Sequence, residues 1–146
     1  MPPMEVDAFL ADSVQAAGGK LHALGIGWRV IQASAIPARH DRIGIGLIVR
    51  TAPKEAGQHT LTLTLLDPAG AARAFGAGGP LQATFASPDG QGTATLALNL
   101  DGLVFETEGE HTFVLAIDGA ETTRLSFRVQ TTPEPPVSEF RTGVYL

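Results

Sequence analysis

The fold is decided by residues 110–130, EHTFVLAIDGAETTRLSFRVQ. In both halves of this stretch every second residue is apolar, namely Phe113, Leu115 and Ile117, then Leu125, Phe127 and Val129. A strand sends every second side chain to one face, whereas a helix needs apolar residues about 3.6 positions apart. Asp118 and Gly119, between the halves, favour a tight turn. The stretch therefore predicts a β-hairpin with one apolar face, and that face needs a second sheet to pack against.

Short alternating segments separated by Gly, Pro and Asp turns continue through the rest of the chain, up to about residue 131. The clearest are 43–49, 60–65 and 93–100. Strands and turns at this spacing are typical of an antiparallel sandwich. We predict an all-β, immunoglobulin-like sandwich of two sheets and about eight or nine strands over residues 5–131, with no helix of ordinary length.

Some local predictions depend on fewer residues. The mildly apolar stretch 6–15 predicts an edge strand, with a short helical turn as the alternative. We expect a loop over 37–42, and we expect Asp101-Gly102 to end the strand at 93–100. Gly44 and Gly46 alternate with apolar residues, which indicates a bulge or a close approach of another part of the chain.

Three motifs near the start resemble a known family. They are ADSVQ at 11–15, GGKL at 18–21 and GxGW at 25–28. Together they resemble the opening of a family of small bacterial proteins that is a domain of unknown function, and the 118–119 hairpin is similar to that family's closing one. The resemblance covers most of residues 5–130. It implies a β-sandwich, and because its motifs look structural, it implies no catalytic residue.

The amino-acid composition excludes several classes of protein function. A chain of 146 residues with 44% hydrophobic residues can bury a core as one domain. It contains no cysteine, which excludes disulfides, thiolate zinc sites and cysteine nucleophiles. The net charge is -5 and we find no cluster of Lys and Arg, so we expect no nucleic-acid partner. No apolar run is long enough to span a membrane and no secretory signal is evident, so we expect a cytoplasmic protein.

Neither a metal site nor a catalytic site is predicted. No two of the four histidines stand two or four residues apart, so no local metal pair exists, and we expect no tightly bound transition metal and no cofactor. His59 and His111 each begin a strand and could meet on one rim, but exposed strand-start positions are the favoured interpretation. No Gly-x-Ser-x-Gly elbow and no phosphate-binding loop followed by a helix is present. We therefore expect the chain not to be an enzyme.

Other residue patterns have a structural and a binding interpretation. Asp67, Asp89, Asp101 and Asp118 each open a turn, and turn chemistry is the favoured reason for them. Carboxylates gathered at one end of a sandwich could instead bind calcium. Trp28 is the only tryptophan; we favour a place in the core over a stacking surface for sugars.

The C-terminal tail carries the main functional prediction. Residues 132–146 contain three prolines within 133–136, which favour an extended spacer. Four bulky residues follow it, Phe140, Val144, Tyr145 and Leu146. We predict that these four residues bind a protein partner or another copy of the chain, with Phe140 and Tyr145 as anchors; a disordered terminus is the alternative.

The predicted function is a non-catalytic interaction module, or a subunit of a bacterial protein assembly, that docks through this tail. The alternative is a module that binds a small ligand, either carbohydrate or calcium, with its rim loops.

Overall fold

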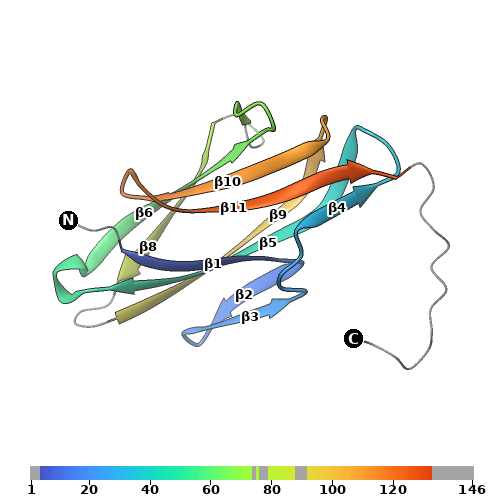
Figure 1. Cartoon of the computed structure of the whole chain (residues 1–146). Helices are drawn as coiled ribbons and strands as arrows, with labels where there is room; N and C mark the ends of the chain where they lie inside the picture. The colour runs from blue at the N-terminus through green and yellow to red at the C-terminus, as the bar shows by residue number, and fades with distance from the viewer. Residues whose placement is uncertain (1–3, 74, 76–78, 88–91, 133–146) are drawn as a thin grey trace, which may run out of the picture.

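The closing hairpin has the structure that its alternation predicts. In the computed structural model, which describes residues 4–73, 75, 79–87 and 92–132, β10 (Gly109–Ile117) pairs antiparallel with β11 (Ala120–Thr131) (Figure 1). Asp118 and Gly119 form the turn, with φ values of 51° and 85°. These are left-handed conformations, which Asp and Gly adopt more readily than other residues do. Leu115 at the centre of β10 is completely buried, as predicted.

The described residues form nine further strands and one short helix. The strands are β1 (Glu5–Ala11), β2 (Ser13–Ala17), β3 (Lys20–Leu24), β4 (Val30–Ala33), β5 (Ala38–Thr51), β6 (Gly57–Leu66), β7 (Ala72–Arg73), β8 (Leu81–Ser87) and β9 (Gly92–Phe105). The helix is a single 3₁₀ turn, η1 (Pro53–Glu55). The described strands outnumber the eight or nine predicted, in part because the stretch 6–15 is divided at Asp12 into β1 and β2.

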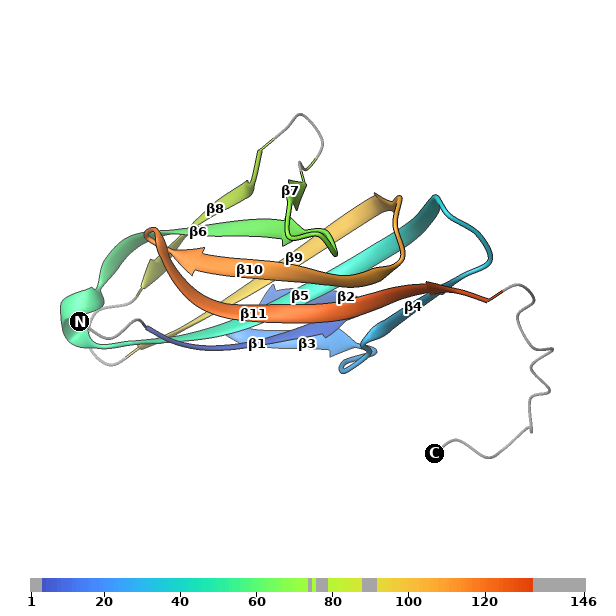
Figure 2. The ribbon, with the colours of Figure 1, turned by 45° about the horizontal axis from the view of Figure 1, so that its top comes forward.

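The strands build two facing sheets and a smaller hairpin. One sheet has the order β1-β5-β9, and the other has the order β4-β11-β10-β6-β7, with β8 also paired to β6 (Figures 1 and 2). All neighbours are antiparallel except β4 and β11, which run parallel. The prediction of an all-β sandwich is confirmed. No helix among the described residues is long and apolar enough to cross a membrane.

The core lies between the two sheets and is filled by the apolar faces of the alternating segments. Its fully buried large side chains include Ile43, Ile45, Leu47, Leu61, Leu63, Leu65, Phe105, Phe113, Leu115 and Phe127. Each face supplies side chains two positions apart, as the period of a strand requires. The inward set predicted for 43–49 and for 60–65 is therefore confirmed.

Two predicted interruptions are wrong because β5 and β9 form one long ladder. Their pairing extends from Ala38↔Phe105 to Thr51↔Gly92, so residues 38–42 are strand and not loop. The same ladder continues through Asp101 and Gly102, which were expected to end β9. Gly102 has a positive φ of 71°, and Asp101 forms an ion pair with Arg42 on the neighbouring strand. Local turn chemistry is thus accommodated within the strand.

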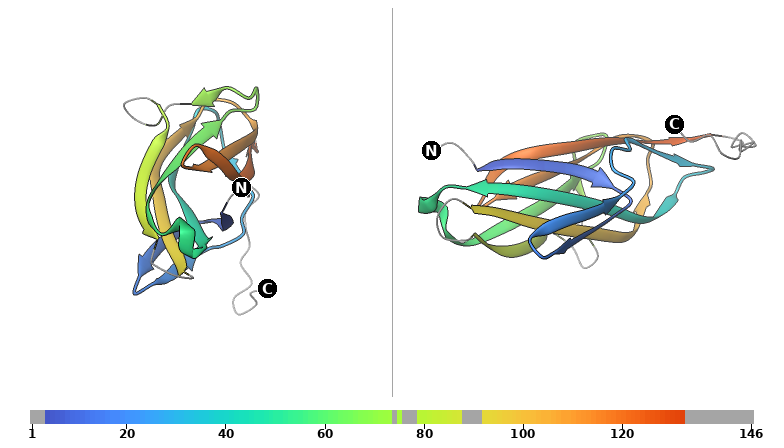
Figure 3. Two further views of the ribbon diagram at one scale, coloured as in Figure 1. Left: turned by 90° about the vertical axis from the view of Figure 1, so that its left-hand side faces the viewer. Right: turned by 90° about the horizontal axis from the view of Figure 1, so that it is seen from below.

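The β2–β3 hairpin forms a partial third layer on the outer face of the smaller sheet (Figure 3). A Cβ on Gly44 would lie 3.1 Å from the backbone of Ser13, and one on Gly46 would lie 2.3 Å from the Phe9 ring. The predicted close approach at these glycines is confirmed. The Asn99 side-chain amide bonds both the N–H and the C=O of Val14, at 3.0 and 2.9 Å, and so fixes β2 to β9.

The last strand ends at Thr131, next to β4. The Thr132 N–H donates to the Ala33 carbonyl at 3.0 Å, and the Glu108 carboxylate accepts a bond from the Thr131 N–H at 2.6 Å. The predicted tail residues, Phe140, Val144, Tyr145 and Leu146, lie outside the described residues.

Candidate functional site

The most exposed large apolar side chains among the described residues lie at the end of β3, on the segment that follows it and at the start of β4. Leu24 is 73% exposed and Ile26 is 60% exposed, and Val30, just beyond, is 43% exposed. Scattered exposed apolar residues are common, but here three occur within seven positions. We call Leu24 and Ile26, with the intervening Gly25, the apolar loop.

The apolar loop is held in place by the backbone of the β1–β2 junction. The Asp12 N–H donates to the Leu24 carbonyl at 2.8 Å, and the Gly27 N–H donates to the Leu10 carbonyl at 3.0 Å. Gly25 has a φ of 70°, and a Cβ there would lie 2.1 Å from the Asp12 carboxylate. This position therefore favours glycine. The apolar side chains are presented on a fixed backbone, which lowers the entropy lost on binding.

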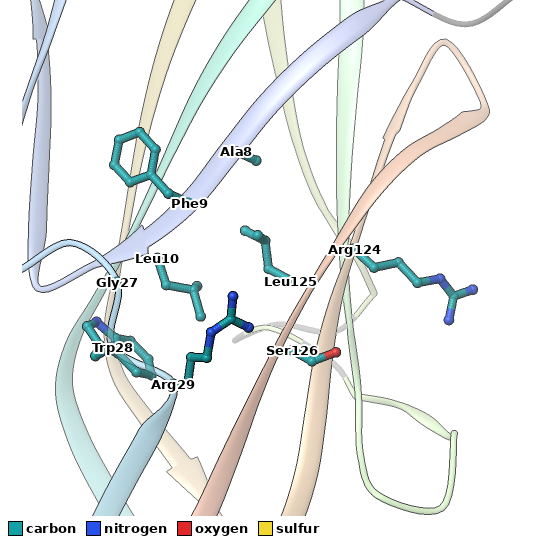
Figure 4. A pocket seen from close by; sticks show the side chains of 9 residues that line it. All are labelled: Ala8, Phe9, Leu10, Gly27, Trp28, Arg29, Arg124, Leu125 and Ser126. Atoms are coloured by element: carbon teal, nitrogen blue, oxygen red, sulfur yellow. The ribbon is translucent and has the colours of Figure 1, made fainter.

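A small cavity adjoins the loop at the seam between β1 and β11. It has a volume of about 180 Å³ and is lined by Ala8, Phe9, Leu10, Gly27, Trp28, Arg29, Arg124, Leu125 and Ser126. Figure 4 shows the Arg29 guanidinium between Leu10 and Leu125, while Arg124 points away. Pockets for small organic ligands usually measure about 300–1,000 Å³. This cavity is too small for such a ligand, although one partner side chain would fit it.

The same seam is closed to an added strand. Cα atoms of β1 and β11 approach within 8 Å of each other. Neighbouring strands lie about 4.7–4.9 Å apart, so a strand inserted between β1 and β11 would need roughly twice that distance. A partner can therefore contact this side of the sandwich from outside but cannot extend a sheet into the seam.

Trp28 lies neither fully in the core nor on an open surface that could stack on a sugar. Its ring is half-buried, packs edge-on against Phe127 at 5.7 Å and lies at a tilt against His40 at 5.9 Å. Its Nε1 atom is buried and has no hydrogen-bond partner in the described protein. The ring therefore supports the edge of the core, and the geometry does not present it as an open platform for a sugar.

His59 and Asp118 form a structural link at one end of the larger sheet, where the start of β6 meets the β10–β11 turn. His59 Nδ1 lies 2.6 Å from Asp118 Oδ2, and its Nε2 bonds the Glu55 carbonyl. The Asp118 carboxylate also accepts a bond from the Thr60 N–H at 2.9 Å. Because both ring nitrogens of His59 are engaged, neither is available to move a substrate proton. This pair fixes the β10–β11 turn to β6 and η1.

The pair makes stability depend on pH. Its hydrogen bonds raise the pKa of His59 above its usual 6.5, and the bond from His59 lowers the pKa of Asp118 below its usual 3.8. A raised histidine pKa stabilises the fold below pH 6.5 and loses that effect as the pH rises through the folded value. A lowered carboxyl pKa stabilises above pH 3.8 and loses that effect as the pH falls. Both contributions are present between about pH 4 and 6.5.

We expect the loss of unfolding free energy in His59→Gln, relative to the native chain, to be largest between pH 4 and 6.5. The loss should shrink as the pH rises above 6.5. Urea unfolding of both chains at pH 5, 7 and 9 measures this difference, and His22→Gln, at an exposed site on β3, serves as the control. A loss for His59→Gln that stays constant across this range would show that the charged pair does not stabilise the fold.

The expectation that His111 is an exposed residue at the start of a strand is wrong. It is completely buried, stacks on Phe127 at 5.6 Å and meets the edge of Phe105 at 5.0 Å. Its Nδ1 bonds the Gly109 carbonyl at 3.1 Å, while Nε2 has no partner within the described residues. Burial lowers the pKa of His111. His59 and His111 lie at opposite ends of the β6–β10 ladder, so they share no rim.

The rim aspartates have separate structural partners. Asp67 accepts bonds from the Ala69 and Ala71 N–H groups, both at 2.9 Å, while Asp101 pairs with Arg42 within the sheet. In the part of the chain that the structure describes, no three His, Asp or Glu side chains converge on a possible metal position. Asp89 lies outside the described residues. The calcium alternative therefore has no geometric support among those described.

A family model for a family of unknown function (DUF6941) matches residues 6–130. The chain belongs to this family. The resemblance that the ADSVQ, GGKL and GxGW motifs indicated is thereby confirmed at the level of a domain of unknown function. No curated protein matches the chain in sequence.

Solved structures resemble the DUF6941 chain in fold at low sequence identity. The AlkC alkylpurine DNA glycosylase of Pseudomonas fluorescens, bound to DNA with an abasic site analog, has a TM-score of 0.50 and 7% identity over 87% of this chain and 30% of that chain. A β-glucosidase from Listeria innocua has a TM-score of 0.49 and 10% identity over 88% of this chain and 16% of that chain. An immunoglobulin-like protein from Pseudomonas aeruginosa has a TM-score of 0.42 and 12% identity over 88% of this chain and 98% of that chain.

These likenesses concern the fold alone. The DUF6941 chain is an all-β sandwich, and it spans less than a third of the glycosylase chain. Because β-sandwiches occur in proteins with many unrelated functions, function has to be inferred from the surface of this chain.

Sequence reasoning missed the apolar loop of this DUF6941 domain. Its GxGW motif contained the signal, since an apolar residue placed between two glycines has few neighbours to cover it. The motif was interpreted as structural, and Gly25 and Gly27 do have that role. Ile26 between them nevertheless faces solvent.

Proposed function

We propose that this domain is a non-catalytic protein-interaction module of the bacterial cytoplasm, working as a subunit of a larger assembly. It docks onto a protein partner or another copy of itself through the C-terminal tail. The apolar loop provides a second contact surface on the folded domain. The family match and the sandwich fold are compatible with this function but leave the binding mode open.

One observation carries the proposal, namely the exposure of Leu24 and Ile26 on a fixed backbone. Apolar area left in water costs about 25 cal/mol per Å² relative to burial. A loop that keeps two such side chains exposed while its backbone is hydrogen-bonded is suited to bury them against a partner. Binding energy usually concentrates in a few such anchors.

The tail supports the same function from the sequence. Its prolines favour a stiff spacer of about 3.1 Å per residue, which would hold the anchors Phe140 and Tyr145 away from the parent domain. A tail with four bulky apolar or aromatic residues in its last seven is suited to docking. The remaining Val144 and Leu146 would add apolar contact beside these anchors.

Native mass spectrometry of the full chain tests the proposal. We expect a mass above that of one chain, arising from self-association or a retained partner. Leu24→Ser and Ile26→Ser should each weaken the complex about tenfold or more, because truncating a hot-spot residue costs about 2 kcal/mol or more. Val104→Ser, at a 39% exposed apolar site elsewhere, is the matched control and should have no effect. A single-chain mass under gentle conditions would contradict the proposal.

A further inference from the structure

The sandwich has a long free sheet edge along β9. β9 is an edge strand, paired only with β5 in its sheet. The Leu10 carbonyl bonds Gly27, so on β1 the backbone groups of Leu10 face away from β5, and those of Phe9 and Ala11 face toward it. Following this alternation across the ladders, the backbone groups of β9 that face away from β5 belong to Thr93, Thr95, Ala97, Asn99 and Asp101.

The other described edges are shorter or occupied. β4 has four residues and β8 has seven, while β9 has fourteen. The edge of β1 faces the closed seam with β11. β8 and β9 meet at one end, where Thr51 bonds both Ser87 and Gly92, and then diverge (Figure 2). Beyond that junction no other described strand pairs with β9 along its free edge from Thr93 to Asp101. Further along β9, the Arg73 side chain bonds the Val104 carbonyl at 2.7 Å.

The core is incompletely covered along this edge. Leu98 and Leu100 point inward, yet they are only half-buried, whereas their partners on β5, Ile45 and Ile43, are completely buried. A strand added beside β9 would continue the smaller sheet and cover these leucines. Unpaired edges attract such strands because the added backbone bonds both its N–H and C=O groups.

The C-terminal segment has the pattern of a matching strand. If residues 140–146 extend, Phe140, Val144 and Leu146 share one face with Thr142, and Arg141 and Tyr145 lie on the other. The first face suits the half-buried leucines, and the second suits the polar outer side of β9. Seven residues span about 23 Å, which fits within the roughly 30 Å of free edge between Thr93 and Asp101.

A second copy delivers this segment more readily than the same chain does. Thr131 and Thr132 are fixed beside β4, which pairs with β11. The smaller sheet lies next to β11 at β1, and β9 is the opposite edge of that sheet. To reach its own β9, the chain would have to turn across the end of both sheets at Pro135 and Pro136, which disfavour a tight reversal. A tail from another copy needs no such turn, and mutual exchange gives a closed two-fold dimer.

We propose that the free edge of β9 is the receptor for residues 140–146 of a second copy, which add to it as a strand. This inference rests on the proposed docking function and names its partner. The absence of cysteine allows a direct test, because introduced thiols are the only ones present.

Mixing two full-length variants tests the geometry. Ala97→Cys chains and Tyr145→Cys chains, treated together with a short thiol cross-linker, should give a product that contains one chain of each. Thr62→Cys, on the outer face of β6, replaces Ala97→Cys as the control and should give none. Absence of the mixed product, or equal yields with the control, would overturn the assignment.

A second measurement separates this inference from the function on which it rests. Thr95→Lys places a charge on the free edge, and Val144→Asp places a charge on the tail. Each variant should raise the dimer dissociation constant tenfold or more. Thr62→Lys, the control, should not raise it. The amides of Ala97 and Asn99 should exchange slowly in the native chain and faster in Val144→Asp. An oligomer that needs Val144 but is indifferent to Thr95→Lys would refute the β9 receptor and leave the docking function standing. A native chain that neither self-associates nor retains a protein partner would refute both.

Discussion

Replacing Phe127 with alanine is expected to lower the free energy of unfolding by about 3–5 kcal/mol. Phe127 is 2% exposed and contacts four rings, those of Trp28, Phe105, His111 and Phe113, with centroids 5.4–5.7 Å away. The substitution removes a large buried side chain and leaves a cavity that these rings can fill only in part. Urea unfolding followed by tryptophan fluorescence measures the loss, since Trp28 is itself one of the contacts.

Arg128→Ala is the matched control for this prediction. Arg128 is the next residue on β11 and is exposed, so its truncation should change stability by no more than about 0.5 kcal/mol. Similar losses in both variants would mean that the aromatic cluster does not hold the two sheets together.

Leu115→Ala is expected to cost about 2–5 kcal/mol, because Leu115 is completely buried at the centre of β10. Thr62, which is half-buried on the outer side of the neighbouring strand β6, should tolerate alanine within roughly 0.5 kcal/mol. Chemical denaturation of the two variants compares the faces of one sheet. Equal losses of stability in Leu115→Ala and Thr62→Ala would show that the inward face or the strand register assigned to β10 and β6 is wrong.

The sandwich was predictable from the sequence because its strands alternate with the period of two that burial on one face imposes. Leu61, Leu63 and Leu65 on β6 face the core for that reason. Gly44 and Gly46 were correctly interpreted as sites of close approach, since an ordinary side chain there would overlap Ser13 or Phe9.

The errors arose where long-range pairing overrides local chemistry. Asp101-Gly102 is a strong turn signal, yet β9 continues through it because β5 provides a ladder of hydrogen bonds and Arg42 pairs with Asp101. The burial of His111 depends on Phe105 and Phe127, which approach it only in the folded chain. No local pattern contains either partner.

The candidate site was only partly predictable, because exposure is a property of the whole surface. The sequence pointed to the tail, whose apolar residues follow a proline spacer. It did not point to Leu24, whose exposure depends on how the β2–β3 hairpin lies on the smaller sheet. It also did not reveal the β9 edge, since the order of strands within a sheet is set by tertiary pairing.

The central claim is that the tail docks, and hydrogen exchange of residues 138–146 in the full-length, associated protein tests it most directly. If these residues bind as a strand, their amides should exchange at least about tenfold more slowly than in a free peptide of the same sequence, since bonded amides exchange only on opening. Free-peptide exchange rates throughout residues 138–146 would contradict the claim.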